Sequence, residues 1–207
     1  MPDPISWSEA APYYAAFALL GYLLGSIPFG LLITKAAGLG DIRKVGSGNI
    51  GATNVLRTGN KGAAAATLLL DALKAVAAVL IGREFGGPDG AVIGGVFAFL
   101  GHLFPVWLKF DGGKGVACFF GVAFAAFWPV GALAAGTWLG FAFLSRISSL
   151  SALVTAAATP VFFYWFGRFQ WMEAFIFISL LVFIRHKDNI KRLIKGEEPR
   201  IGASKDK

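Results

Sequence analysis

Residues 116–144 read VACFFGVAFAAFWPVGALAAGTWLGFAFL, a run that contains no Asp, Glu, Lys or Arg. A helix that crosses the hydrocarbon core of a bilayer needs about 20 mostly apolar residues, so this run is longer than one span requires. Similar apolar stretches recur from Tyr13 to Ile184, with short polar breaks between them. This pattern predicts a membrane protein rather than a water-soluble core.

The composition of the whole chain agrees with that prediction. Of the 207 residues, 56% are apolar and 15% are charged, and the mean hydropathy is +0.65. The apolar stretches leave no room for a separate soluble domain, so we expect one integral membrane domain over residues 1–207. Residues 1–12 carry Asp3 and Glu9 but no Lys or Arg, unlike a secretory signal peptide, so the first apolar stretch is expected to stay as a helix. A single cysteine, Cys118, excludes an intrachain disulfide and a Cys-based zinc cluster.

The apolar stretches predict an all-α fold, a polytopic membrane bundle of seven transmembrane helices. The long run is divided at Trp128-Pro129, because proline tends to stop a helix and tryptophan favours the membrane interface. One long, kinked span across this run is the alternative, and it gives six spans. A kink is also expected at GSIPFG, residues 25–30, because proline removes a backbone donor. The expected helices are Tyr13–Ala37, Gly62–Ile81, Gly90–Leu108, Gly115–Phe127, Pro129–Leu144, Ser149–Phe166 and Trp171–Ile184.

The distribution of Lys and Arg decides between seven spans and six. With seven, all 19 basic residues except Lys74, Arg83 and Arg168 fall on one side of the membrane. The positive-inside rule makes that side cytoplasmic, so we expect the N-terminus outside and the C-terminus in the cytoplasm. Seven spans also bring every polar segment with chemical potential to the same face. The net charge of +7 is therefore assigned to topology and to anionic lipid headgroups, and not to nucleic-acid binding.

The first polar segment, residues 40–57, reads GDIRKVGSGNIGATNVLR. It contains a formal G-x-G-x-x-G match at residues 46–51, but no βαβ unit surrounds it, so we reject a dinucleotide site. The glycines allow backbone N–H groups to converge on an anion, and polar side chains add hydrogen bonds. We favour a phosphate-binding loop over the alternative, a solvated loop whose glycines only make turns. The candidate side chains are Ser47, Asn49, Thr53, Asn54 and Arg57.

The second polar segment, residues 101–115, reads GHLFPVWLKFDGGKG. Its glycines leave the backbone open around Lys114, where the next helix starts and its dipole favours an anion. It is not a Walker A loop, because Leu108 stands in place of the first glycine and Gly115 in place of Ser or Thr. A second phosphate site is predicted here, and snorkelling of Lys114 to the headgroups is the alternative.

The third polar segment, residues 185–192, reads RHKDNIKR and runs on to GEEP at residues 196–199. If the last helix continues past Ile184, His186, Asn189 and Ile190 share one face. His186 is then either a functional group or an ordinary polar residue at the membrane boundary. A stripe of lysines at four-residue spacing is expected to contact anionic lipid: Lys187, Lys191 and Lys195.

Two smaller features lie outside these segments. Asp71 and Lys74, three residues apart within the second span, are placed to pair, and ionisable groups inside a membrane are functional candidates by default. We favour a structural role, because a neutralised pair is less costly to bury and the loops supply better chemistry. Arg146, with Ser148 and Ser149, forms a polar corner that offers a further donor to a phosphate.

Together, the polar segments resemble the bacterial glycerol-3-phosphate acyltransferases that use acyl phosphate. The strings that carry the resemblance are GSIPFG, DIRxxGSGNIGATNVxR, GHxxPV, FxGGKGVA, RHxxNIxRL and GxE, in this order. The resemblance spans roughly Gly21 to Glu198. Asp111 departs from it, because the family often has lysine before the glycines, and the local positive charge is lower here.

The resemblance implies a reaction and a set of site residues. The sn-1 hydroxyl of sn-glycerol 3-phosphate attacks acyl phosphate, giving 1-acyl-sn-glycerol 3-phosphate and inorganic phosphate for phospholipid synthesis at the cytoplasmic face of the inner membrane. It implies no metal, no cofactor and no carrier protein, and the product passes into membrane lipid. The implied catalytic residues are Ser47, Arg57, Lys114, His186 and Asn189. The implied substrate-binding residues are Asn49, Asn54, Gly113, Ser149 and Glu198, of which Glu198 alternatively holds the segments together.

The group that accepts the proton of the hydroxyl is left open by the sequence. His186 is a candidate base because its ordinary pKa lies near neutrality. The resemblance implies instead that the phosphate of the substrate takes the proton. The His-x-x-x-x-Asp motif of other acyltransferases is excluded, because Trp107 and Lys191 stand five residues after the two histidines.

A transporter of a phosphorylated metabolite is the main alternative function, because it would share basic, Gly-rich sites in a helical bundle. Transporters usually carry internal repeats and binding residues at the membrane midplane. This sequence shows no such repeat, and its polar groups gather on one face apart from Asp71 and Lys74. An enzyme at the membrane interface is therefore preferred, and a purely structural membrane protein is less favoured still.

Overall fold

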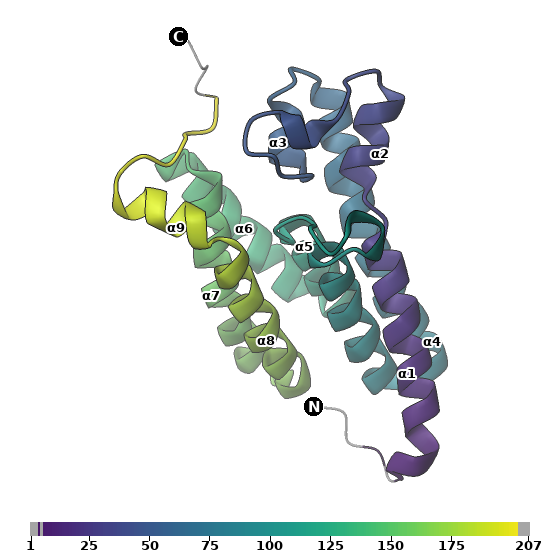
Figure 1. Ribbon diagram of the computed structural model, residues 1–207. Coiled ribbons are helices and arrows are strands. Elements are labelled where there is room, and N and C mark those ends of the chain that lie inside the picture. Colours follow the sequence, from purple (N-terminus) through teal and green to yellow (C-terminus); the bar gives the residue numbers. More distant parts are fainter. Residues whose placement is uncertain (1–3, 5, 203–207) are drawn as a thin grey trace. The chain divides into compact units, whose positions relative to one another are not determined.

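The computed structural model describes residue 4 and residues 6–202, and every regular element in this part of the chain is a helix (Figure 1). The expected all-α class is confirmed. The expectations that involve Asp3, Lys205 and Lys207 fall outside the described residues. The chain forms two compact units, Met1–Trp128 and Pro129–Lys207. The single domain over residues 1–207 stays a prediction.

The first helical stretch breaks at the proline, as the sequence predicts. Helix α1 covers Trp7–Ser26 and α2 covers Phe29–Ala36. Ile27, between them, is extended with φ −64° and ψ 116°. The start at Trp7 lies ahead of the predicted start at Tyr13, so only this boundary needs correction.

The second and third predicted helices form one hairpin. Helix α4, Lys61–Leu103, turns at Gly87, whose φ of 60° and ψ of −154° favour glycine. A Cβ atom added at Gly82 would lie 2.1 Å from the carbonyl oxygen of Gly90, and one at Gly94 would lie 2.5 Å from that of Ala78. The two arms, residues 61–86 and 88–103, therefore run antiparallel, and the predicted break at residues 82–89 shrinks to one residue.

Helix α1 packs on the second arm of this hairpin. Added Cβ atoms at Gly21 and Gly25 would lie 2.4 and 2.0 Å from the carbonyl oxygens of Gly94 and Ala98. Small residues that allow two helices to approach this closely are typical of helix packing in lipid. Since the residue numbers rise together along the contact, α1 and residues 88–103 run parallel.

Short elements connect the helices of the first unit. The 3-10 turn η1, Ile42–Lys44, and α3, Ala52–Leu56, lie between α2 and α4. The 3-10 turn η2, Val106–Leu108, and α5, Val116–Ala126, follow α4. The predicted bounds of α5 agree within about one residue. The predicted third helix ends too late, because α4 stops at Leu103 and not at Leu108, and η1, α3 and η2 were not predicted.

The second unit contains the remaining helices, which are α6 (Trp128–Ser145), α7 (Ser148–Trp165), α8 (Phe169–Arg185) and α9 (Lys187–Ile194). Phe127, with φ −160° and ψ 106°, is extended and separates α6 from α5. The predicted division of the long apolar run is therefore confirmed. Between α7 and α8, the ring of Phe163 packs on that of Phe175 with centroids 4.7 Å apart.

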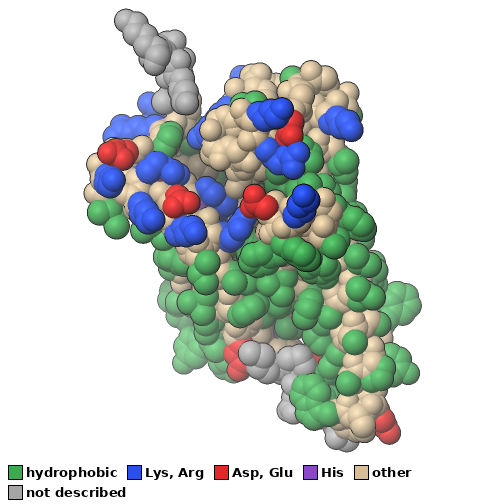
Figure 2. Space-filling view, viewed as in Figure 1, with side chains coloured by type: hydrophobic (Ala, Val, Ile, Leu, Met, Phe, Trp, Pro, Cys, Tyr) green, Lys and Arg blue, Asp and Glu red, His purple; other side chains and the backbone are tan. Residues whose placement is uncertain are grey.

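The helices have the apolar exterior of membrane spans. Three stretches are long and apolar enough to cross a bilayer (Trp7–Ala36, Lys61–Leu108 and Trp128–Ser145), and α8 with α9 makes a fourth if their 63° bend lies within one span. Leu69, Phe143 and Leu180 expose 58%, 86% and 58% of their surfaces. On the face drawn in Figure 2, hydrophobic side chains cover the helices, while Lys and Arg gather around α2 and α3 in the first unit and over α9 in the second. The count of seven spans and their orientation stay predictions.

Candidate functional site

The loop between α2 and α4 is built around the amide of Asn54, which is buried. Its Nδ2 donates to the carbonyl oxygens of Ile42, Val45 and Asn49 at 3.1, 2.9 and 2.8 Å. Its Oδ1 accepts from the backbone N–H of Ser47 at 3.0 Å. These bonds hold the Gly-rich turn in one conformation, so in this structure Asn54 serves the loop itself.

Ser47 and Arg57 meet on the exposed side of this loop. The hydroxyl of Ser47 lies 3.3 Å from Asn54 Oδ1, and Nη1 of Arg57 lies 3.5 Å from the same oxygen. The side chain of Arg57 covers Gly46, where an added Cβ would lie 2.8 Å from Arg57 Cδ. A hydroxyl and a guanidinium are thus brought together beside a turn of backbone amides, as a phosphate site requires.

Asn49 takes part in the same loop. Its Oδ1 accepts from the backbone N–H of Gly51 at 2.8 Å, and its carbonyl oxygen accepts from Asn54. The side-chain oxygen therefore closes a local turn at the start of α3. Thr53, on the same helix, is exposed.

An ion pair fixes the entrance to the loop. The carboxylate of Asp41 accepts from the backbone N–H of Arg43 at 3.0 Å and from its guanidinium Nη2 at 2.7 Å. These hydrogen bonds hold the pKa of Asp41 at about 2, below its usual value. Hydrogen bonding to Asp41 also raises the pKa of Arg43, and the charge of Asp111 adds a smaller contribution in the same direction. The guanidinium of Arg43 is therefore paired with the carboxylate of Asp41.

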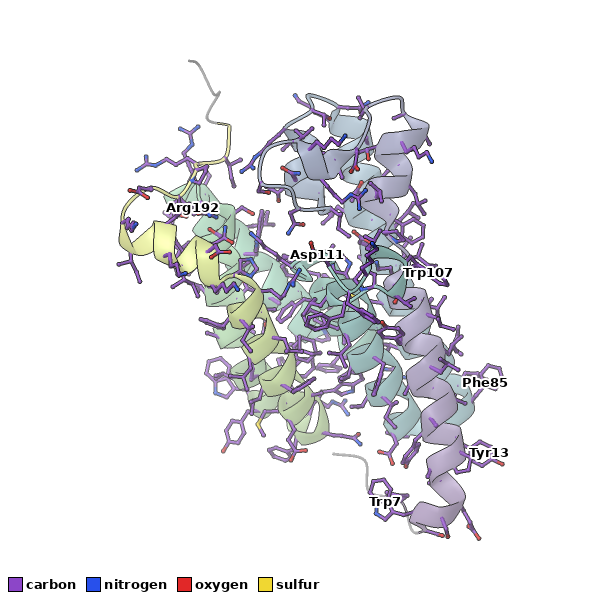
Figure 3. The ribbon with its side chains drawn as sticks, in the orientation of Figure 1. Trp7, Tyr13, Phe85, Trp107, Asp111 and Arg192 are labelled. Carbon is purple, nitrogen blue, oxygen red and sulfur yellow. The ribbon has the colours of Figure 1, made fainter. Side chains whose placement is uncertain are left out.

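The second polar segment packs against the first. Leu108, in η2, packs on a small apolar cluster beneath the first loop: Ile42, Ile50, Val55, Ala63 and Ala64. Figure 3 places Trp107 and Asp111 in this same segment, away from Trp7 and Tyr13 at the start of α1. The two segments that carry Arg57 and Lys114 thus share one core, as expected for neighbouring phosphate sites.

The Gly-Gly-Lys turn lies against the end of α4. The N–H groups of Gly112 and Gly113 donate to the carbonyl oxygens of Leu103 and His102, each at 3.1 Å. Lys114 follows and is half-buried, one residue before Gly115, which caps α5. The structure therefore places Lys114 beside a helix N-terminus, where the dipole favours an anion.

A buried polar cluster lies within the helices of the same unit. The ammonium of Lys74 lies 2.8 Å from Asp71 Oδ1, which confirms the expected pairing. Nδ1 of His102 lies 3.6 Å from the same oxygen, and Lys74 Nζ donates to the carbonyl oxygen of Ile27 at 2.7 Å. The sequence analysis quoted His102 as part of a motif but gave it no role. Two features of the sequence could have indicated a role for His102. It lies close to a Gly-rich turn, and the chain carries a charge pair inside a predicted span.

In the second unit, Glu198 gathers three donors. Its Oε1 accepts from Ser149 Oγ at 2.7 Å and Asn189 Nδ2 at 2.5 Å, and its Oε2 accepts from Arg192 Nε at 2.7 Å. Burial alone raises the pKa of this carboxyl group, but hydrogen bonds from Asn189, Ser149 and Arg192 outweigh burial and lower it. Glu198 joins the start of α7 to α9, which supports the reading that it holds segments together. Arg192 was missed as its partner, although it stands in the RHxxNIxRL string.

His186 lies at the junction between α8 and α9. The helix continues past Ile184 by one residue only, and α9 begins after a 63° bend. His186 is buried, and its Nδ1 lies 2.8 Å from the carbonyl oxygen of Val182. Since a carbonyl oxygen only accepts, Nδ1 donates this hydrogen bond. Asn189, one turn into α9, is buried with Glu198, and Ile190 is half-buried.

Arg146 contacts the C-terminal end of the described residues. None of its described hydrogen bonds is to a candidate site residue. Its carbonyl oxygen accepts from the backbone N–H of Ile201 at 2.6 Å, and its Nη2 donates to the carbonyl oxygen of Ile201 at 3.3 Å. Within residues 4 and 6–202, His, Cys, Asp and Glu form no group of three or more that is placed to hold a metal ion.

Comparison with known protein families gives a match over most of the chain. The family model described as glycerol-3-phosphate acyltransferase matches residues 15–196. The glycerol-3-phosphate acyltransferase of Rhodopseudomonas palustris (strain BisB5) is 59% identical over 192 residues, which are 93% of this chain and 98% of the relative. That of Mesorhizobium japonicum is 60% identical over 185 residues, which are 89% of this chain and 94% of the relative.

Solved structures give a match of the same extent. The crystal structure of PlsY (YgiH), an integral membrane glycerol 3-phosphate acyltransferase, in its glycerol 3-phosphate form has a TM-score of 0.87 and 37% sequence identity, and the match covers 92% of this chain and 96% of that chain. The lysophosphatidic acid form has a TM-score of 0.85 and 36% identity, with the same coverage.

Proposed function

We propose, from the premise that this chain belongs to the glycerol-3-phosphate acyltransferase family, that it transfers a fatty acyl group from acyl phosphate to the sn-1 hydroxyl of sn-glycerol 3-phosphate. The names of the relatives support the acceptor. The assignment of acyl phosphate as the donor is supported by the two Gly-rich, cationic segments around Arg57 and Lys114, which pack on one apolar core. Two phosphate sites suit a reaction in which both substrates carry a phosphate.

The reaction balances without a further reactant. The sn-1 hydroxyl oxygen forms a bond to the acyl carbonyl carbon, and the bond from that carbon to the phosphate oxygen breaks. The proton of the hydroxyl leaves with the phosphate group as hydrogen phosphate, so the products are 1-acyl-sn-glycerol 3-phosphate and inorganic phosphate. Negative charge gathers on the carbonyl and phosphate oxygens in the transition state, where fixed cations stabilise it.

The first unit supplies the principal phosphate-binding groups in this proposal. Arg57 and Lys114 bind phosphate oxygens through their cations, and Ser47 adds a hydroxyl beside Arg57. The amides of Gly112 and Gly113 bond to the end of α4, so Gly113 contributes through the turn that presents Lys114. Asn49 and Asn54 act through the loop, because their side chains bond to its backbone.

The family resemblance, rather than a contact in the structure, is the ground for keeping His186 and Asn189 of the second unit as catalytic residues in this proposal. Nε2 of His186 is an acceptor for the substrate hydroxyl in the neutral ring. Asn189 and Ser149 both donate to Glu198, so Glu198 orients them rather than binding substrate itself. No cofactor, metal or carrier protein takes part in this proposal.

The seven helices each cross the inner membrane in this proposal, with the N-terminus outside and the three polar segments at the cytoplasmic face. The antiparallel arms of α4 and the parallel course of α1 and residues 88–103 support this count. Because the two arms of α4 run antiparallel, this proposal has residues 37–60 and 104–115 on the same side of the membrane. The acyl chains of donor and product then lie against lipid, near the cytoplasmic leaflet.

Acyl transfer is direct, without an acyl-enzyme. Nucleophilic catalysis needs an activated Ser, Cys or Lys with a base beside it. Cys118 is fully buried in α5, and the described contacts of Ser47 are to Asn54, which is not a base. Acyl phosphate is already activated, so holding both substrates in attack geometry suffices. Cys118→Ala is expected to keep nearly full activity, and enzyme mixed with labelled acyl phosphate alone should show no acylated protein by intact mass.

The donor is tested by comparing three acyl donors with labelled glycerol 3-phosphate and purified protein. Acyl phosphate is expected to give product at a rate well above acyl-CoA or acyl-carrier protein. Comparable rates with either of these, in protein freed of other acyltransferases, would contradict the donor assignment. Uptake of labelled glycerol 3-phosphate into sealed proteoliposomes, without acylation, would favour the transporter instead.

A further inference from the structure

A chain of polar contacts connects the break in the first helical stretch to the Gly-Gly-Lys turn. The carbonyl oxygen of Ile27, beside the proline break, accepts from Lys74 Nζ at 2.7 Å. Lys74 pairs with Asp71 at 2.8 Å, and Asp71 Oδ1 lies 3.6 Å from His102 Nδ1. The other nitrogen of His102 faces Gly113, because a Cβ added at Gly113 would lie 2.2 Å from His102 Nε2.

This cluster, Asp71, Lys74 and His102, is deeply buried, with 1%, 5% and 3% of each residue exposed. Burying an ion pair costs several kcal/mol per ion before the pair's attraction is counted, and replacing such pairs with apolar residues is often neutral or stabilising. Inside a membrane, apolar alternatives are also easier to accommodate. Stability alone therefore does not account for the cluster.

The geometry of the cluster bears directly on the turn that precedes Lys114. The ring of His102 leaves space for a glycine only at position 113, and the carbonyl oxygens of His102 and Leu103 accept from the two turn amides at 3.1 Å. On its far side the imidazole ring faces Asp71 at 3.6 Å, an ion-pair distance longer than a hydrogen bond, and Asp71 pairs with Lys74. A displacement of the ring must therefore move the turn or lose these contacts.

We infer that Asp71, Lys74 and His102 are positioning residues that fix the Gly-Gly-Lys turn, and with it the ammonium of Lys114, for a substrate phosphate. The inference rests on the proposed function. The cluster touches no reacting atom in this account. It acts through the ring of His102 and the backbone at Gly113, and the Ile27 carbonyl ties it to the break between α1 and α2.

Two variants probe the cluster in the full-length protein. Asp71→Leu with Lys74→Met removes both charges together, so no unpaired ion is left behind, and Ile27 still accepts from the N–H of Phe29. His102→Asn keeps a polar group toward Asp71 but removes the ring from beneath Gly113. Thr67→Val is the matched control. Thr67 is buried in the same helix arm, and its described hydrogen bond is donated within that arm, to the carbonyl oxygen of Ala63.

The measurement is a double-mutant cycle for kcat/KM with Lys114→Ala. Each cluster variant is expected to lower kcat/KM about tenfold or more in the wild-type background, and by less than about threefold once Lys114 is absent, because residues acting through one group are not additive. Thr67→Val should change kcat/KM little in either background. The double apolar variant should unfold thermally at the wild-type temperature or above it.

An equal loss in both backgrounds, or no loss in the wild-type background, overturns the inference. If the double apolar variant does not purify as a folded protein, the cycle with His102→Asn decides alone. Wild-type protein that forms no product with acyl phosphate and glycerol 3-phosphate contradicts the proposed function instead, so the two failures are distinct.

Discussion

Among the polar residues, Asn54 and Glu198 play comparable parts in their two units. Asn54 gathers the carbonyl groups of the first loop, and Glu198 gathers side-chain donors from α7 and α9. Each buried group satisfies its hydrogen-bonding capacity within the protein, as buried polar groups require. Beside Asn54, the exposed side chains of Ser47 and Arg57 are thereby held next to the Gly-rich turn.

Arg57→Ala and Lys114→Ala should each remove one charged hydrogen bond to phosphate in the transition state. The expected loss is about 2 to 4 kcal/mol, or roughly a hundredfold in kcat/KM. Steady-state kinetics with both substrates measure it, and Lys44→Ala, an exposed lysine of the same loop, serves as the control. Near-normal kcat/KM in both variants would show that these side chains only extend to the headgroups.

Replacing Asp111 with lysine is expected to improve substrate binding, unlike the two alanine substitutions above. It is exposed, and its charge attracts Arg43. Asp111→Lys restores the positive charge common in the family, so KM for the phosphorylated substrates should fall by up to about fivefold at low salt, with kcat unchanged, because exposed charges contribute about 1 kcal/mol or less. The effect should fade at high ionic strength, where such charges are screened. A KM that does not change at low salt would show that the charge at position 111 does not affect substrate binding.

At the scale of elements, the junction of α7 and α9 depends on the ionised form of Glu198. A carboxyl group whose pKa is lowered on folding contributes stability that is full above its unfolded pKa and is lost as the pH falls through the folded value. For Glu198 the unfolded pKa is about 4.5, so its contribution should decline in the range below this. Glu198→Gln should destabilise the protein near neutral pH by roughly 1 to 3 kcal/mol.

Thermal unfolding in detergent, followed from pH 7 to well below pH 4.5, measures this contribution. The gap in Tm between wild type and Glu198→Gln should narrow as the pH falls. Glu197→Gln, at the neighbouring exposed position, should show little gap at any pH. A gap that stays constant through the acid range would mean that the charge of Glu198 does not stabilise the junction.

The apolar stretches made the helices predictable, and the places where prediction fell short have physical reasons. Residues 82–86 fall outside the predicted helices, but the tight contact of Gly82 with Gly90 keeps them helical. The five residues of α3 are too few to give a period. The 63° bend at His186 has no counterpart in the apolar periodicity of the sequence.

Considering the molecule as a whole, the sequence located the segments of the candidate site but not the partners of their side chains. Gly-rich strings pointed to Ser47, Arg57 and Lys114 because each segment has its own composition. The bond from Ser149 to Glu198 joins residues 49 positions apart, and the approach of His102 to Gly113 depends on how the loop folds back on the end of α4. Such contacts follow from three-dimensional packing, so a single sequence does not contain a local signal for them.

Orientation in the membrane is tested with single cysteines on a Cys118→Ala background. Lys61 and Glu9 are both exposed, the first at the start of α4 and the second near the start of α1. Under the positive-inside rule, Lys61→Cys should react with an impermeant thiol reagent only after cells are opened, and Glu9→Cys should react in intact cells. The reverse pattern would invert the topology.

The central claim is that this membrane protein joins two phosphorylated substrates by direct acyl transfer. The most direct measurement is a reaction of purified protein with acyl phosphate and labelled glycerol 3-phosphate, in which acylated product and inorganic phosphate are quantified together. Direct transfer predicts 1-acyl-sn-glycerol 3-phosphate and inorganic phosphate in equal amounts, with neither formed at a comparable rate when glycerol 3-phosphate is omitted. Phosphate release that does not depend on glycerol 3-phosphate, or folded protein that forms no acylated product, would contradict it.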